Sequence, residues 1–171
     1  MLAVGATGTL GLTIAGHAGR YEEAHPACPL RYFTRREYRI VTDLANTMFP
    51  PRNALGITGT EARVPEYMDH MLAGMRADKA SELRAMFLLF EHGTLAFGLR
   101  TQRFTELTPT DQERYLRRWE RAQVYSRRML VAGLKAFLGM AYFAHPAVRE
   151  RLGIQHLCGS PADALPREEW S

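Results

Sequence analysis

The sequence predicts an all-α protein, folded as a single-domain bundle of about five to six helices. Apolar residues recur three or four positions apart, as in Tyr38, Val41 and Leu44, and this spacing places them on one side of a helix. No stretch of useful length alternates apolar and polar residues as a half-buried strand does. With 171 residues, 46% of them apolar, the chain is long enough for one domain with a sizeable core.

The first helix is expected to begin at Thr34, where the domain itself is expected to start. Thr34 and Glu37 form a capping box, in which each side chain satisfies a backbone N–H of the first turn. The proline pair that begins at Pro50 ends this helix. Residues 53–63 have the composition of a surface loop. Pro65 suits the first position of the second helix, where its missing N–H costs nothing.

The third helix is predicted over residues 78–90, and Gly93 is expected to loosen the chain that follows it. Residues 100–107 form a connection. The fourth helix is capped by Thr108, which is followed by proline and, three positions after the threonine, by Asp111.

The fifth helix is predicted over residues 124–143. It is apolar around much of its circumference, so a central position in the bundle is expected. A short sixth helix spans 146–152 and stops at Gly153. The folded domain therefore covers residues 34–154, and residues 155–171 form an extended tail.

The chain begins with residues 1–19, a segment that contains no charged side chain. It has the character of an export signal core or of a membrane anchor, and both interpretations stay open. Residues 20–33, broken twice by proline, are interpreted as a linker.

A dinucleotide-binding turn is the competing hypothesis for the start of the chain, because Gly5, Gly8 and Gly11 reproduce a Gly-rich phosphate loop. A nicotinamide-dependent oxidoreductase fragment would follow from it. The context argues against this hypothesis, because the strand, helix and second strand that such a turn requires are not evident around it.

The fourth helix carries the candidate partner-binding residues. Its basic side chains fall at i, i+3, i+4 and i+7 and form one face, with an aromatic ring beside it: Arg114, Arg117, Arg118, Arg121 and Trp119. Arginine and tryptophan are enriched at interface hot spots. A solvated face with a core tryptophan is the alternative. Nucleic-acid binding is a further alternative, which the few lysines and the lack of a known motif disfavour.

Candidate catalytic groups are weak. The pairs Asp69-His70 and Glu91-His92 are sequence neighbours, which point about 100° apart on a helix, so exposed or capping roles are expected for them. No catalytic, cofactor-binding or metal-binding residue is nominated. Four methionines mark either an adaptable groove or flexible core packing: Met68, Met71, Met75 and Met86.

The cysteines and the basic residues leave alternatives open. Cys28 and Cys158 belong to no C-x-x-C motif and are either a disulfide between the two tails or unrelated thiols. The net charge is +4, and arginine supplies nearly all of the basic side chains. This bias indicates an interface protein or reflects genomic base composition.

Several landmarks together resemble the gluconate 2-dehydrogenase subunit 3 family. They are Met48-Phe49-Pro50-Pro51, Arg63-Val64-Pro65-Glu66-Tyr67-Met68-Asp69, Trp119-Glu120-Arg121, and Ala141-Tyr142-Phe143 followed by Pro146-Ala147-Val148. The resemblance covers roughly residues 33–154.

The resemblance implies a helical accessory subunit, without catalytic residues of its own, that binds, stabilises and escorts a large subunit. That partner would be a flavin-dependent dehydrogenase of the glucose-methanol-choline type, with FAD in the large subunit and none in this chain. It would oxidise alcohols or sugars and pass electrons to a cytochrome or a quinone, with a cytochrome c subunit as a further partner in the complex. The implied location is the bacterial periplasm or the periplasmic face of the inner membrane, with residues 1–19 as the membrane contact.

Overall fold

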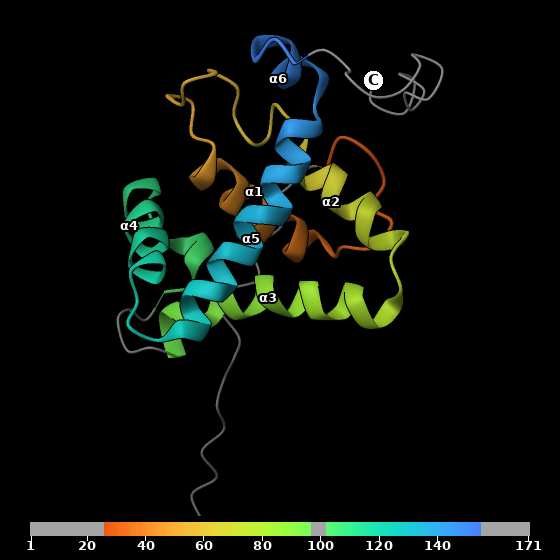
Figure 1. The fold of residues 1–171 in the computed structure, drawn as a ribbon. Helices are drawn as coiled ribbons and strands as arrows, with labels where there is room; N and C mark the ends of the chain where they lie inside the picture. The colour runs from red at the N-terminus through yellow and green to blue at the C-terminus, as the bar shows by residue number, and fades with distance from the viewer. Residues whose placement is uncertain (1–25, 97–101, 155–171) are drawn as a thin grey trace, which may run out of the picture.

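The computed structural model describes residues 26–96 and 102–154. In these residues the chain forms helices and no strand, so the all-α prediction is confirmed. The helices pack as one bundle, in which α5 crosses the others and α3 lies along one end (Figure 1). The elements in order are α1 (Arg35–Met48), α2 (Val64–Ala73), α3 (Ala77–Ala96), the 3₁₀ turn η2 (Phe104–Glu106), α4 (Pro109–Glu120), α5 (Tyr125–Ala144) and α6 (Pro146–Arg151).

Helix α1 begins as the sequence predicts. The backbone N–H of Thr34 donates to Glu37 Oε2 at 2.9 Å, and the backbone N–H of Glu37 donates to Thr34 Oγ1 at 3.3 Å, so both halves of the capping box are present. Phe49 forms the C-cap, directly before the proline pair. The buried side chains of α1 include Ile40 and Leu44, neither of which is exposed. Local sequence therefore sets both ends of this helix.

The chain packs against α2 before it reaches Thr34. The Asp69 carboxylate, buried on α2, accepts backbone N–H groups from Arg31 at 2.7 Å, Tyr32 at 2.9 Å and Phe33 at 2.7 Å. Phe33 itself is only 5% exposed and belongs to the core. The folded part thus includes the last residues of the segment interpreted as a linker.

Helix α3 is longer than predicted, because it continues through Gly93 to Ala96. A Cβ atom at Gly93 would lie 2.5 Å from Trp119 Cζ2 and 2.5 Å from the Tyr115 hydroxyl oxygen. The glycine is therefore needed for close packing of α3 against α4, and it does not end the helix. The expected stop near Phe90 was wrong.

An aromatic cluster joins α3, η2 and α4 around Phe90. The ring centroid of Phe90 lies 5.0 Å from that of Phe104, 5.0 Å from that of Tyr115 and 5.4 Å from that of Trp119. The Tyr115 hydroxyl donates to the Phe90 carbonyl at 3.2 Å. Tilted and edge-on ring pairs of this kind add stabilisation beyond the area that they bury. This cluster fixes the position of α4.

Helix α5 packs against α2, α3, α4 and α6, as its expected central position requires, but only one of its sides is buried. Its buried side carries Leu134 and Leu138, which are not exposed, and Tyr142, which is 1% exposed. Tyr142 stacks on Phe49 with ring centroids 3.8 Å apart and donates from its hydroxyl to the Ile57 carbonyl at 2.8 Å. The outward side of α5 carries exposed apolar residues. Helix α6 follows and ends before Gly153, whose φ of +65° suits glycine, as predicted.

Candidate partner-binding surface

Helix α4 presents its arginines to solvent. Arg114, Arg117, Arg118 and Arg121 are all exposed. Arg114 lies 2.5 Å from Asp111 and Arg117 lies 2.5 Å from Glu113, each as an ion pair within the helix. Exposed pairs of this kind contribute little to stability, but they partly neutralise the basic face and lower the repulsion along it. A role in binding a partner stays a prediction for these four arginines.

Trp119 does not lie on this surface. The side chain is 3% exposed and belongs to the aromatic cluster around Phe90. The Arg127 guanidinium lies 5.7 Å from the centroid of the Trp119 ring. The structure therefore agrees with the alternative given in the sequence analysis, in which Trp119 is a core residue. Its ring supports the basic face from beneath. The exposed arginines, without the tryptophan ring, remain the candidate contact.

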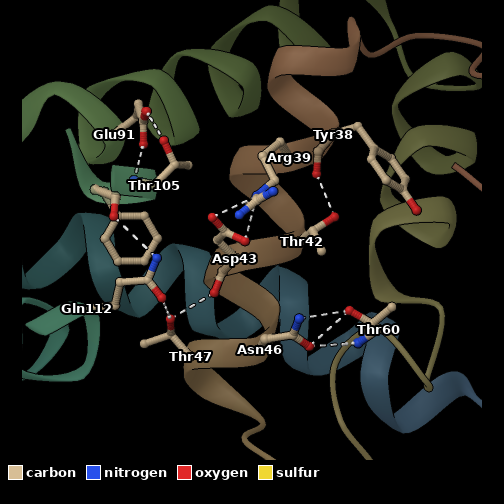
Figure 2. A network of polar contacts seen from close by, with 11 residues as sticks. Tyr38, Arg39, Thr42, Asp43, Asn46, Thr47, Thr60, Glu91, Thr105 and Gln112 are labelled. Atoms are coloured by element: carbon tan, nitrogen blue, oxygen red, sulfur yellow. Dashed lines mark hydrogen bonds and ion pairs between the residues drawn. The ribbon is translucent and has the colours of Figure 1, made fainter. Parts of the chain in front are cut away.

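A cleft of about 430 Å³ opens between α1, the loop after it and the start of α4. Figure 2 shows the polar side chains beside it. Thr47 Oγ1 lies 2.7 Å from the Asp43 carbonyl oxygen and 3.2 Å from Gln112 Oε1. Asn46 Nδ2 donates to Thr60 Oγ1 at 2.8 Å, and Asn46 Oδ1 accepts the backbone N–H of Thr60 at 3.0 Å. These groups bind one another, so the network ties α1 to the loop and to α4.

Asp43 is the carboxylate that α1 contributes to this cleft. Burial raises the pKa of the Asp43 carboxyl, and the neighbouring Arg39 guanidinium opposes the rise. Arg39 Nε contacts both carboxylate oxygens at 2.9 Å (Figure 2). A carboxylate held in this way is positioned by an ion pair within its own helix, and its geometry indicates a structural role.

A second, shallower groove of about 320 Å³ lies between α4 and α5. Its lining combines the α4 residues Glu113, Arg117 and Arg121 with Lys135 of α5. Lys135 pairs with Glu120 at 2.5 Å. Glu120 also lines the groove, so its three basic side chains face two acidic ones and the positive charge that continues from α4 to α5 is partly neutralised.

The two sequence-adjacent pairs do not act as pairs. Asp69 binds the backbone of residues 31–33, as described above. Glu91 is fully buried and accepts Thr105 Oγ1 at 2.7 Å and the Thr105 backbone N–H at 3.1 Å (Figure 2). The exposed role was wrong for both carboxylates. Asp69 accepts three backbone N–H groups from a distant segment, and Glu91 accepts one, in the first turn of η2.

The histidine beside Glu91 is turned toward α1. His92 Nε2 lies 2.6 Å from Arg36 Nη2. Burial lowers the pKa of the His92 ring, and the Arg36 charge lowers it further. A neutral imidazole that accepts from a guanidinium is a helix-to-helix contact. Sequence spacing gave no signal for it, because the two residues are 56 positions apart.

The methionines considered as a groove pack into or against the core. Met68 is fully buried, and the other three are half-buried and pack against the core cluster: Met71, Met75 and Met86. These methionines therefore serve as flexible core packing, which was the second of the two interpretations. In the described residues no three His, Cys, Asp or Glu side chains are placed to hold a metal ion. Within those same residues, no helix is both long and apolar enough to cross a membrane.

Some expectations fall outside the described residues. The Gly5, Gly8 and Gly11 turn and the rest of residues 1–19 lie there, as does Cys158, so the pairing of Cys158 with Cys28 stays a prediction. The described ranges contain helices and no strand, and they hold no part of the alternating α/β unit that a nicotinamide-binding turn opens.

The fold and surface define a small all-α protein with a charged helix face and buried carboxylates used for packing. Comparison with known families matches residues 35–156 to gluconate 2-dehydrogenase subunit 3, and the chain belongs to this family. The match covers every helix from α1 to α6. No match was found among curated proteins or among solved structures.

Proposed function

We propose that the chain is the small, non-catalytic subunit of a flavin-dependent dehydrogenase of the glucose-methanol-choline type, which it binds, stabilises and escorts. Family membership over residues 35–156 is the observation that carries this proposal. The family name describes a subunit of a multi-subunit dehydrogenase. The structure adds that Asp69 and Glu91, two deeply buried carboxylates, bind backbone N–H groups of the chain itself.

The proposal assigns the redox chemistry to the large subunit. FAD belongs there, and the substrate is an alcohol or a sugar. The reduced flavin passes its electrons onward, with a cytochrome c subunit as the acceptor within the complex. The proposed location is the periplasm or the periplasmic face of the inner membrane, with residues 1–19 as export signal or anchor.

The proposal is tested by co-expression with a flavin-dependent dehydrogenase of the glucose-methanol-choline type from the same organism. We expect this chain to increase the yield of soluble, flavin-loaded large subunit, because a bound partner stabilises the folded form by mass action. The measurement is the flavin absorbance of the purified large subunit, with and without this chain. An equal flavin yield in both preparations, with no co-purification, would sink the proposal.

A further inference from the structure

The outward side of α5 carries a continuous apolar stripe. Its members occur three or four residues apart along the whole helix: Tyr125, Met129, Ala132, Ala136, Met140 and Phe143. All six are exposed, and the exposed fractions of the large ones are 67% for Tyr125, 49% for Met129, 45% for Met140 and 49% for Phe143. Single exposed apolar residues are normal, whereas a contiguous patch marks a binding surface.

The size of the stripe fits the centre of an interface. Eighteen residue steps of 1.5 Å give a length of about 27 Å, and a helix face roughly 10 Å wide then gives an area on the order of 300 Å². A standard interface buries about 800 Å² on each partner. The stripe therefore accounts for about a third of such a surface, and its surroundings must supply the polar rim.

Those surroundings are basic. Helix α5 carries three basic residues and no acidic one. Arg128 lies with its guanidinium 5.7 Å from the centroid of the Tyr125 ring, at one end of the stripe. Along the α4 side, the shallow groove described above is lined by Arg117, Arg121 and Lys135 and by two acidic residues. Glu113 pairs with Arg117 and Glu120 pairs with Lys135, so the flank keeps a smaller, net positive charge. Figure 1 shows α4 beside α5.

We propose that the α5 stripe and this basic flank together form the docking surface for the large dehydrogenase subunit. This inference rests on the proposed function and names the surface through which it acts. The matching surface of the partner is an apolar ridge with carboxylates along one side. The apolar centre supplies affinity, and the charged flank sets orientation and association rate.

A second copy of this chain is a poor occupant. Two stripes paired about a two-fold axis would bring α5 against α5, and each of these helices bears only positive charges. Like charges placed opposite each other at an interface are unfavourable. Self-pairing through the stripe alone would also bury much less than the 800 Å² per partner of a standard interface.

The test measures binding of the full chain to the proposed large subunit, a flavin-dependent dehydrogenase of the glucose-methanol-choline type from the same organism. Met129→Glu with Met140→Glu should weaken binding at least about 100-fold, because charges replace two contacts at the interface centre. Leu89→Glu with Leu95→Glu is the matched control on α3, where the two leucines are 50% and 44% exposed. The control pair should stay within about threefold of wild type.

A second stripe variant separates binding from folding. Ala132→Glu with Ala136→Glu removes no packed side chain, because both alanines are exposed. It should weaken binding by a similar factor while the circular dichroism spectrum and the Tm of the isolated chain stay unchanged.

The charged flank is tested separately. Arg117→Glu with Arg121→Glu should lower the association rate about tenfold at low salt, with a smaller effect at high salt. Arg52→Glu with Arg76→Glu, at exposed positions outside α4 and α5, should leave the association rate unchanged.

Binding and oligomeric state together distinguish the possible outcomes. If the wild-type chain fails to bind the large subunit, the proposed function fails and this inference fails with it. If wild type binds and the stripe variants bind equally well, the subunit role stands and the docking surface is wrong. If sedimentation shows that the wild-type chain is a dimer that the stripe variants dissociate, the occupant is a second copy and the inference is overturned.

Discussion

Replacing Gly93 with alanine should destabilise the protein even though alanine is the better helix former. The new Cβ atom would lie 2.5 Å from Trp119 Cζ2, 2.5 Å from the Tyr115 hydroxyl oxygen and 3.1 Å from Trp119 Cη2. Both rings are buried, at 3% and 7% exposed, so neither can swing into solvent. A shift of Tyr115 would also stretch its hydrogen bond to the Phe90 carbonyl.

The two opposing effects can be estimated. Overpacking a well-filled core costs about 1–3 kcal/mol, and the upper end applies where two rigid rings must move. Exchange of glycine for alanine within a helix returns up to about 1 kcal/mol. The net loss in the free energy of unfolding should therefore be about 1–2 kcal/mol, which denaturant titration can resolve.

Gly139 provides the matched control. It lies within α5, and a Cβ atom there would meet only Phe143 Cε2 at 3.9 Å, an ordinary contact. Gly139→Ala should therefore stabilise the protein by up to about 1 kcal/mol. The same substitution thus has opposite signs at the two sites. If Gly93→Ala stabilises the chain as much as Gly139→Ala does, the close packing of α3 on α4 is wrong.

Three further predictions concern the folded domain and its start. Asp69→Asn should lower the free energy of unfolding by about 2–3 kcal/mol, because a charged acceptor of three backbone N–H groups is lost. The control is Asp78→Asn at an exposed position. Measured in parallel by denaturation, it should change the free energy of unfolding by less than about 0.5 kcal/mol. Burial raises the pKa of Glu37, but hydrogen bonds from Thr34 and Arg84 outweigh it, so the net pKa lies below the ordinary 4.5. A lowered folded-state pKa gives stability that is present above pH 4.5 and lost as the pH falls through the folded-state value. Glu37→Gln should remove this part of the acid sensitivity. An acid-unfolding curve that is unchanged by Glu37→Gln would contradict this prediction. Deletion of residues 1–20 should leave helical content and Tm unchanged while altering export or anchoring, and an unfolded product would show that the segment belongs to the core.

Local signals in the sequence predicted most of the fold. Thr34 and Thr108 cap α1 and α4 as expected, since capping depends on residues within one turn. The errors came from contacts between distant segments. Gly93 has the composition signal of a helix stop, and only the rings of α4, more than twenty positions away, show why it lies inside α3.

The candidate surface was predictable in part. The basic face of α4 follows from helical spacing, and its four arginines are exposed. The burial of Trp119 could not be decided from spacing, because an aromatic residue beside a charged face can pack into the core or contact a partner. The stripe on α5 had a signal in the sequence. Apolar residues on both sides of a long helix imply either complete enclosure or one side reserved for a partner, and only packing distinguishes them.

The most direct test of the central claim is the mass of the purified complex. The tagged 19.4 kDa chain is co-expressed with the proposed large flavoprotein subunit from the same organism, and light scattering is recorded during gel filtration. We predict one peak that contains both chains in equal amounts, with flavin absorbance that stays with the large subunit after the two are separated. Separate elution of the two chains, or flavin bound by the isolated small chain, would contradict the assignment as a non-catalytic subunit.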